Sequence, residues 1–172
     1  MSDREWVVTE YCQLVNKNFY FIQKYFEGIV PAGRPDEGVY WRTKEVSEQL
    51  KSLVESAEYE VSYQVAKGAR ESEEEVNRLL AEYLNYAAEY LKKGNPWAIR
   101  EQNRRACCNT ILTSLQMIAN LTVWLEILGE APACHVSHWL NLETDWQVHS
   151  VHSGTELTGV TELVPPAFSY GA

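Results

Sequence analysis

The chain has no lysine or arginine after residue 129. Its last 43 residues hold only acidic charges, at Glu130, Glu143, Asp145, Glu156 and Glu162, and the formal net charge of the whole chain is −9. A phosphate backbone repels a segment with this charge, so we do not expect nucleic acid as a partner. A basic protein surface is a more favourable partner on the same electrostatic grounds.

Cysteines are also few, and their positions exclude a disulfide framework. Cys107 and Cys108 are adjacent within a helical pattern, and Cys12 lies on the apolar stripe of another expected helix. Free thiols of this kind fit a reducing compartment. Residues 2–5 do not resemble a signal peptide, and Ala106–Leu128 is too polar for a membrane span. We therefore expect a cytoplasmic protein without membrane contact, or a component of a virion or other assembly made in the cytoplasm.

Sequence motifs of the common enzyme classes are missing as well. The chain has no Gly-rich phosphate loop, no G-x-S-x-G, no zincin helix motif and no Ser/His/Asp arrangement. The sequence thus favours a non-enzyme over an enzyme. We assign no catalytic residue, no cofactor-binding residue and no cofactor.

Apolar residues recur at helical spacing in four long segments separated by glycine and proline. This pattern predicts an all-α fold, an antiparallel four-helix bundle over residues 1–129. A capping box at Ser72 and Glu75 marks one helix start. Asp3 is expected to cap the first helix, and the other helices to begin between Asp36 and Thr43, at Ser72 and near Asn95. They are expected to end at Gly28, Gly68, Gly94 and Leu128.

The fourth expected helix is apolar around most of its circumference. From Ala106 to Leu128 its only charged residue is Glu126, and a helix of this composition must be covered on more than one side. The chain also has six Trp and ten Tyr, residues that are frequent in cores and interfaces. We therefore predict a homo-oligomer in which this helix supplies buried contacts between subunits.

Residues 130–172 lose the helical pattern and are rich in Gly, Pro, Ser and Thr. We predict an acidic, extended C-terminal tail in which Val136–Leu142 and Trp146–Val151 could pair as a short β-hairpin. The tail is expected to dock on its own or a neighbouring subunit through aromatic side chains, which are Trp139, Trp146, Phe168 and Tyr170.

All four histidines fall in this tail, as two H-x-x-H pairs: His135 with His138, and His149 with His152, with Cys134 before the first pair. Imidazole and thiolate are the usual ligands of zinc and other transition metals. Residues three apart point to opposite faces of a strand, however, so a shared site conflicts with the predicted hairpin. A metal-binding protein, possibly an enzyme, is the alternative function.

Two further groups of charged residues bear on function. Arg100, Arg104 and Arg105 could bind a phosphate or carboxylate, but the preferred interpretation is pairing with glutamates of neighbouring helices such as Glu71, Glu73 and Glu74. Glu55 and Glu58 form an E-x-x-E pair that could bind magnesium; such spacing is more often a solvated helix face.

Two short segments resemble known families. Glu82–Asn85 resembles half of the metal-binding pattern of all-helical nucleotide pyrophosphatases, although Asn85 stands where that pattern has a carboxylate. Val65–Ser72, followed by Glu75, is similar to the interhelical turn of the four-helix proteins encoded in rRNA intervening sequences, a resemblance that implies pentameric bundles. Neither segment identifies a family for the chain.

Taken together, these patterns predict a non-enzymatic structural or interaction protein. We expect it to self-assemble through the apolar fourth helix and the C-terminal arm.

Overall fold

The structure, a computed structural model, describes residues 2–59, 65–157 and 159–166. The all-α prediction is confirmed, since the described residues form six helices and their only β-pairing is an isolated bridge between Ile29 and Glu156. The helices are α1 (Asp3–Tyr25), α2 (Glu37–Tyr59), α3 (Val65–Gly94), α4 (Pro96–Ile99), α5 (Arg104–Ile127) and α6 (Ala131–Leu140).

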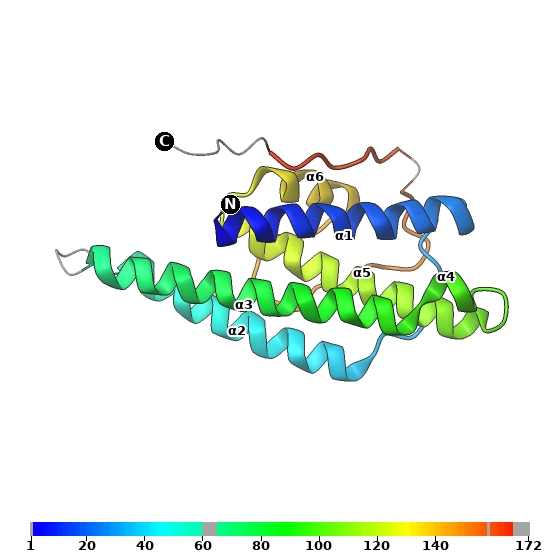
Figure 1. The fold of residues 1–172 in the computed structure, drawn as a ribbon, viewed down its shortest axis with the longest axis horizontal. Helices are drawn as coiled ribbons and strands as arrows, with labels where there is room; N and C mark the ends of the chain where they lie inside the picture. The colour runs from blue at the N-terminus through cyan, green and yellow to red at the C-terminus, as the bar shows by residue number, and fades with distance from the viewer. Residues whose placement is uncertain (1, 60–64, 158, 167–172) are drawn as a thin grey trace.

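The four long helices alternate in direction along the chain (Figure 1). Helices α3 and α5 contact each other, and both contact α1 and α2, which lie on opposite flanks of this central pair. The end of α2 and the start of α3 extend side by side beyond the other helices (Figure 1). The short helix α6 packs against α5.

Helix boundaries differ from the sequence prediction at two places in the first half of the chain. Ser2, not Asp3, caps α1: its hydroxyl accepts from the Glu5 backbone, and the Glu5 side chain accepts in return from the Ser2 backbone. The predicted break between Gly68 and Ser72 is wrong, because both residues lie inside α3. A glycine inside a helix costs only about 1 kcal/mol, which continued helical hydrogen bonding and packing can outweigh.

The expected fourth helix is two helices. Its first turn is the short α4, and α5 begins after Asn103, whose side-chain oxygen accepts from the backbone N–H of Ala106 at 3.1 Å. Before α4, Gly94 ends α3 where the helix approaches α5 closely. A Cβ atom on Gly94 would lie 2.5 Å from the Thr110 Cγ2 atom, so only glycine fits without a shift of the Thr110 side chain or of the helix that carries it.

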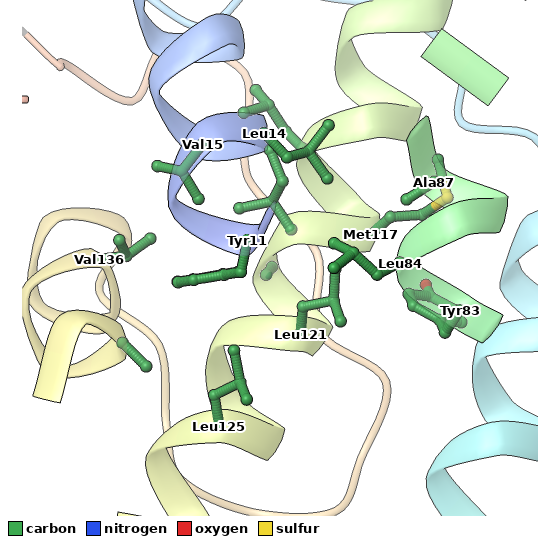
Figure 2. Packing of buried hydrophobic residues seen from close by; sticks show 14 of the residues in the cluster. Tyr11, Leu14, Val15, Tyr83, Leu84, Ala87, Met117, Leu121, Leu125 and Val136 are labelled. Atoms are coloured by element: carbon green, nitrogen blue, oxygen red, sulfur yellow. The ribbon is translucent and has the colours of Figure 1, made fainter. Parts of the chain in front are cut away.

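Helix α5 is the centre of the hydrophobic core. Met117, Leu121 and Leu125 face side chains of α1, α3 and α6 (Figure 2), and the Trp124 ring packs edge-on against Tyr83 at 4.8 Å. By length and composition α5 could cross a membrane, but 89% of its most apolar window is buried inside this chain. The apolar surface that predicted subunit contacts is therefore already covered within one molecule.

The predicted β-hairpin in the tail is wrong. Val136 and Leu140 belong to α6, where their i, i+4 spacing buries both on the side facing the core, and Trp146–Val151 forms no strand. Ala133, also buried, completes this face. The apolar residues of this segment therefore follow helical spacing, and strand alternation would have exposed part of them.

Beyond α6 the chain lies on its own helices and is held by side-chain amides. Asn120 of α5 accepts from the His149 backbone N–H and donates to the His149 carbonyl, both at 2.9 Å. Asn16 of α1 makes the same pair of bonds with Leu163, both at 2.8 Å. Of the aromatic residues expected to dock, Trp139 and Trp146 pack against the core; Phe168 and Tyr170 lie outside the described residues. The division into residues 1–129 and 130–172 stays a prediction.

Candidate functional site

The two H-x-x-H pairs lie in different surroundings. His135 and His138 are exposed on α6, and Cys134 beside them is exposed too. The His149 Nε2 atom lies 2.9 Å from the Asp145 carboxylate, and His152 is exposed. Within residues 2–59, 65–157 and 159–166, no three His, Cys, Asp or Glu side chains lie close enough together to hold a metal ion.

The charged groups on the helices also differ from expectation. Arg104 and Arg105 make no ion pair within 4 Å among the described residues, and Arg100 pairs only with its neighbour Glu101, at 3.7 Å. The glutamates proposed as partners, which are Glu71, Glu73 and Glu74, lie near the start of α3, at the other end of the bundle (Figure 1). The predicted pairing is therefore wrong.

Cations instead sit on aromatic rings where α1 ends and where α4 and α5 begin. The Lys17 Nζ atom is 4.9 Å from the centre of the Trp97 ring. The Arg100 and Arg104 guanidinium carbons are 4.2 Å from the Tyr25 ring and 5.1 Å from the Phe26 ring. We call this region the cation-aromatic surface; it comprises Lys17, Tyr20, Lys24, Tyr25, Phe26, Trp97, Arg100 and Arg104.

A buried ring fixes the aromatic side chains of this surface. Phe21, which is fully buried, contacts Tyr25 at 4.8 Å, Phe26 at 6.0 Å and Trp97 at 5.0 Å between ring centres. The backbone of α4 is held as well, since the Arg100 Nη1 atom donates to the Trp97 carbonyl at 2.8 Å. Because the rings are anchored from the core side, their outer faces and the cations stay available to a partner.

Lys24 extends the surface along α1. Its ammonium lies 5.7 Å from the Tyr20 ring centre and 5.4 Å from that of Tyr25. The Tyr20 ring, and to a smaller extent the Tyr25 ring, raises the pKa of the Lys24 ammonium above its ordinary value. Tyr20 itself is 59% exposed, an unusual fraction for a large aromatic side chain that serves only the fold.

A small cavity of about 160 Å³ lies between α1 and α3 beside this surface. Its polar lining consists of Glu10, Gln13, Lys17 and Asn85, and its apolar lining includes Trp6 and Leu84. Lys17 belongs to both the cavity and the cation-aromatic surface. The cavity can therefore offer hydrogen-bond donors and acceptors to a planar group next to the Trp97 ring.

Aromatic faces interleaved with cations are suited to unpaired nucleotides. Bases stack on such rings, and lysine and arginine contact the phosphates between them. The signal that could have revealed this surface is the helical spacing of Lys17, Tyr20 and Lys24 on the polar side of α1. Tyr25 and Phe26 lie at the end of α1, whereas Trp97, Arg100 and Arg104 come from α4, its C-cap and the start of α5, and only folding brings these two groups together.

No family model matches the chain. It is similar to the methionine–tRNA ligase of Bacillus cereus strain AH187, with 32% identity over 123 residues, which cover 67% of this chain and 19% of the relative. Methionine–tRNA ligase 1 of Alkaliphilus oremlandii is 23% identical over 148 residues, covering 86% of this chain and 25% of that protein. The chain thus spans about a fifth to a quarter of the length of these relatives.

A solved structure supports the same comparison at the level of fold. The methionyl-tRNA synthetase of Mycobacterium tuberculosis, in complex with methionyl-adenylate, superposes with a TM-score of 0.63 at 14% identity. The match covers 89% of this chain and 30% of that one.

These similarities correct three predictions made from the sequence. A non-enzymatic protein that self-assembles through its apolar helix and C-terminal arm is the wrong function, and a homo-oligomeric assembly component is the wrong class. The expectation that nucleic acid is an unlikely partner is also wrong. The cause of the first two errors is α5, whose apolar surface is buried inside the chain. The cause of the third is the use of net charge, which hides a local cluster of cations.

Proposed function

We propose that this chain is a tRNA-binding helical domain related to part of the methionine–tRNA ligases. The observation that carries the proposal is the cation-aromatic surface, on which Lys17, Arg100 and Arg104 each sit over an aromatic ring. The relatives act on tRNA by name, and this surface has the chemistry that unpaired RNA bases and their phosphates require.

Trp97 is the base-stacking residue in this proposal. The Lys17 ammonium lies over the ring, while Phe21 supports the ring from the core. A stacking base takes the place of the ammonium, and the flexible lysine side chain moves to the adjacent phosphate. Gln13 and Asn85 then present hydrogen-bonding groups to a base that reaches the neighbouring cavity.

Local charge makes binding possible despite the net charge of −9. Six cations gather around the end of the bundle at which α4 and α5 begin: Lys17, Lys24, Arg34, Arg100, Arg104 and Arg105. At physiological salt, charges more than about 8 Å apart at the surface are largely screened. The phosphates of a bound strand therefore interact mainly with this cluster, in which Glu101 pairs with Arg100 at 3.7 Å, and only weakly with the acidic groups that lie farther away.

We expect the chain by itself to bind tRNA without attaching an amino acid to it. It spans about a fifth to a quarter of the ligases that it resembles, and its sequence shows none of the common catalytic motifs. A cytoplasmic location fits this role, whereas the similarities lend no support to a virion component.

The experiment is a tRNA-binding titration of Trp97→Ala with Trp41→Ala as matched control. Both tryptophans carry a lysine over the ring, but Trp41 lies on α2, on the opposite flank of the bundle, with Lys44 at 5.4 Å. Loss of one stacked base, about 1–3 kcal/mol, predicts a roughly 5- to 150-fold weaker Kd for Trp97→Ala. Fluorescence anisotropy with a labelled methionine tRNA transcript measures this change.

Circular dichroism should show that both variants fold. Equal Kd values for Trp97→Ala and Trp41→Ala would contradict the stacking role, and a wild-type chain that fails to bind tRNA at micromolar concentrations would contradict the function. Annealing a complementary oligonucleotide to each tRNA loop in turn identifies the loop whose unpaired bases are bound.

A further inference from the structure

A second basic feature lies next to the cation-aromatic surface. The loop between α1 and α2 crosses the start of α5 and leaves an open pocket of about 570 Å³. Three arginines, Arg34, Arg104 and Arg105, line it together with Gly33, Cys108 and Asn109, and its lining contains no acidic residue. We call it the arginine pocket.

The loop is pinned so that these arginines converge. The Arg34 backbone N–H donates to the Asn109 side-chain oxygen at 2.7 Å, and the Asp36 N–H donates to the Thr113 hydroxyl at 3.1 Å. Gly33 passes so close to α5 that a Cβ there would lie 3.0 Å from the Cys108 carbonyl oxygen. The position of Arg34 beside Arg104 and Arg105 is therefore a built feature of the fold.

The charge of the pocket is not neutralised inside the described part of the chain. None of its three arginines lies within 4 Å of a carboxylate there, and α5 begins with Arg104 and Arg105 and has no acidic residue in its first turn. Cations at the positive end of a helix dipole are unfavourable. Arg104 is partly compensated by the Phe26 ring, but no carboxylate offsets the two arginines, and a sequence that breaks this local rule points to an anionic ligand.

We propose that the arginine pocket binds a phosphate group of the RNA backbone, an inference that rests on the proposed function. Arg104 belongs to both features, since it lines the pocket and sits over the Phe26 ring. A strand whose base stacks at Trp97 can therefore continue past Arg100 and place a backbone phosphate in the pocket. The planar guanidinium forks of arginine match phosphate oxygens in pairs. The contact is independent of base sequence.

The first arm of the test measures the salt dependence of tRNA binding. Arg34→Gln with Arg105→Gln removes two pocket cations, and Arg42→Gln with Lys44→Gln, both on α2, is the matched control with the same change of charge. Each phosphate contact contributes about 0.7–0.9 to the slope of log Kd against log salt concentration. We expect the slope of the double variant to be smaller by about 0.7–0.9 or more, and its tRNA binding to be roughly tenfold weaker at low salt. A slope equal to those of the wild type and the control would overturn the proposal.

The second arm uses inorganic phosphate and does not depend on tRNA. Backbone amide shifts on titration should move at residues 33–35 and 104–109 in the wild type and stay unchanged in the double variant. If the wild type fails to bind tRNA, the proposed function fails, and these shifts still decide whether the pocket binds phosphate. Shifts that are absent, or equal in the double variant, overturn the proposal. If phosphate binds but the salt slope of tRNA binding is unaltered, the proposal is overturned, and the ligand of the pocket is a free phosphate compound instead of the RNA backbone.

Discussion

The attachment of the tail to α5 depends on one buried amide, and Asn120→Ala should show how much stability this attachment gives. Asn120 is fully buried. It makes two hydrogen bonds to the His149 backbone, both at 2.9 Å, and a third to the Gln116 carbonyl at 2.7 Å. The alanine variant removes all three and leaves the two His149 backbone groups without these partners.

The expected loss follows from these contacts. Two hydrogen bonds to backbone groups are worth about 1 kcal/mol each, and partial desolvation of the groups left behind adds to this. We expect a loss of about 2–3 kcal/mol in the free energy of unfolding. For a chain of this length that corresponds to a fall in Tm of about 4–12 °C.

Urea denaturation followed by circular dichroism measures the change, with Asn85→Ala as the control because Asn85 is exposed on α3. A second comparison isolates the mechanism: in a chain shortened after Leu140, Asn120→Ala should cost much less, because His149 is gone. A loss below about 0.5 kcal/mol in the full chain, or an equal loss in the shortened chain, would show that Asn120 does not hold the tail on α5.

Three further results are expected. Burial holds the pKa of Tyr11 and of Tyr83 well above their ordinary value of 10, so above pH 10 the unfolded state ionises first and stability falls by up to about 1.4 kcal/mol per pH unit per tyrosine; Tyr11→Phe should make this fall shallower in alkaline denaturation. Gly94→Ala should destabilise by about 1–3 kcal/mol through its contact with Thr110, and Thr110→Ala should restore part of the loss in thermal melts. Lys17→Glu should weaken tRNA binding by about tenfold in anisotropy titrations, with an unchanged Tm because the side chain is exposed.

Helical periodicity predicted the helices well and their boundaries less well. The apolar stripes of α1 and α3 can be recognised in the sequence because the residues of a buried helix face repeat with the helical period. Gly68 and Ser72 looked like a boundary, yet α3 continues through them. The glycine costs the helix only about 1 kcal/mol, and the hydrogen bonds and packing of the 30-residue helix outweigh this cost.

The segment Val136–Leu142 shows that the sequence alone can suggest the wrong secondary structure for buried residues. Val136 and Leu140 belong to α6, and they become core residues only because α6 packs against α5. The apolar residues of this short segment are compatible with either a strand or a helix, since a short apolar run shows too few repeats to reveal its period.

The candidate site was harder to predict than the fold. Arg100, Arg104 and Arg105 were visible as possible phosphate ligands in the sequence, but Trp97 and Tyr25 were not visible as their neighbours. Cation-aromatic contacts join residues as far apart as Lys17 and Trp97, and spacing along one helix does not reveal them.

By itself the sequence determined that the chain is all-α, that α5 must be buried on every side, and that no common catalytic motif is present. Periodicity and composition are properties of neighbours along the chain, so they survive without the fold. Tertiary structure alone decided what covers α5, and it gathered six cations, four of them over aromatic rings, at one end of an acidic chain. Net charge sums over the whole chain, whereas recognition depends on charges within about 8 Å of one another, and that distance is set only by folding.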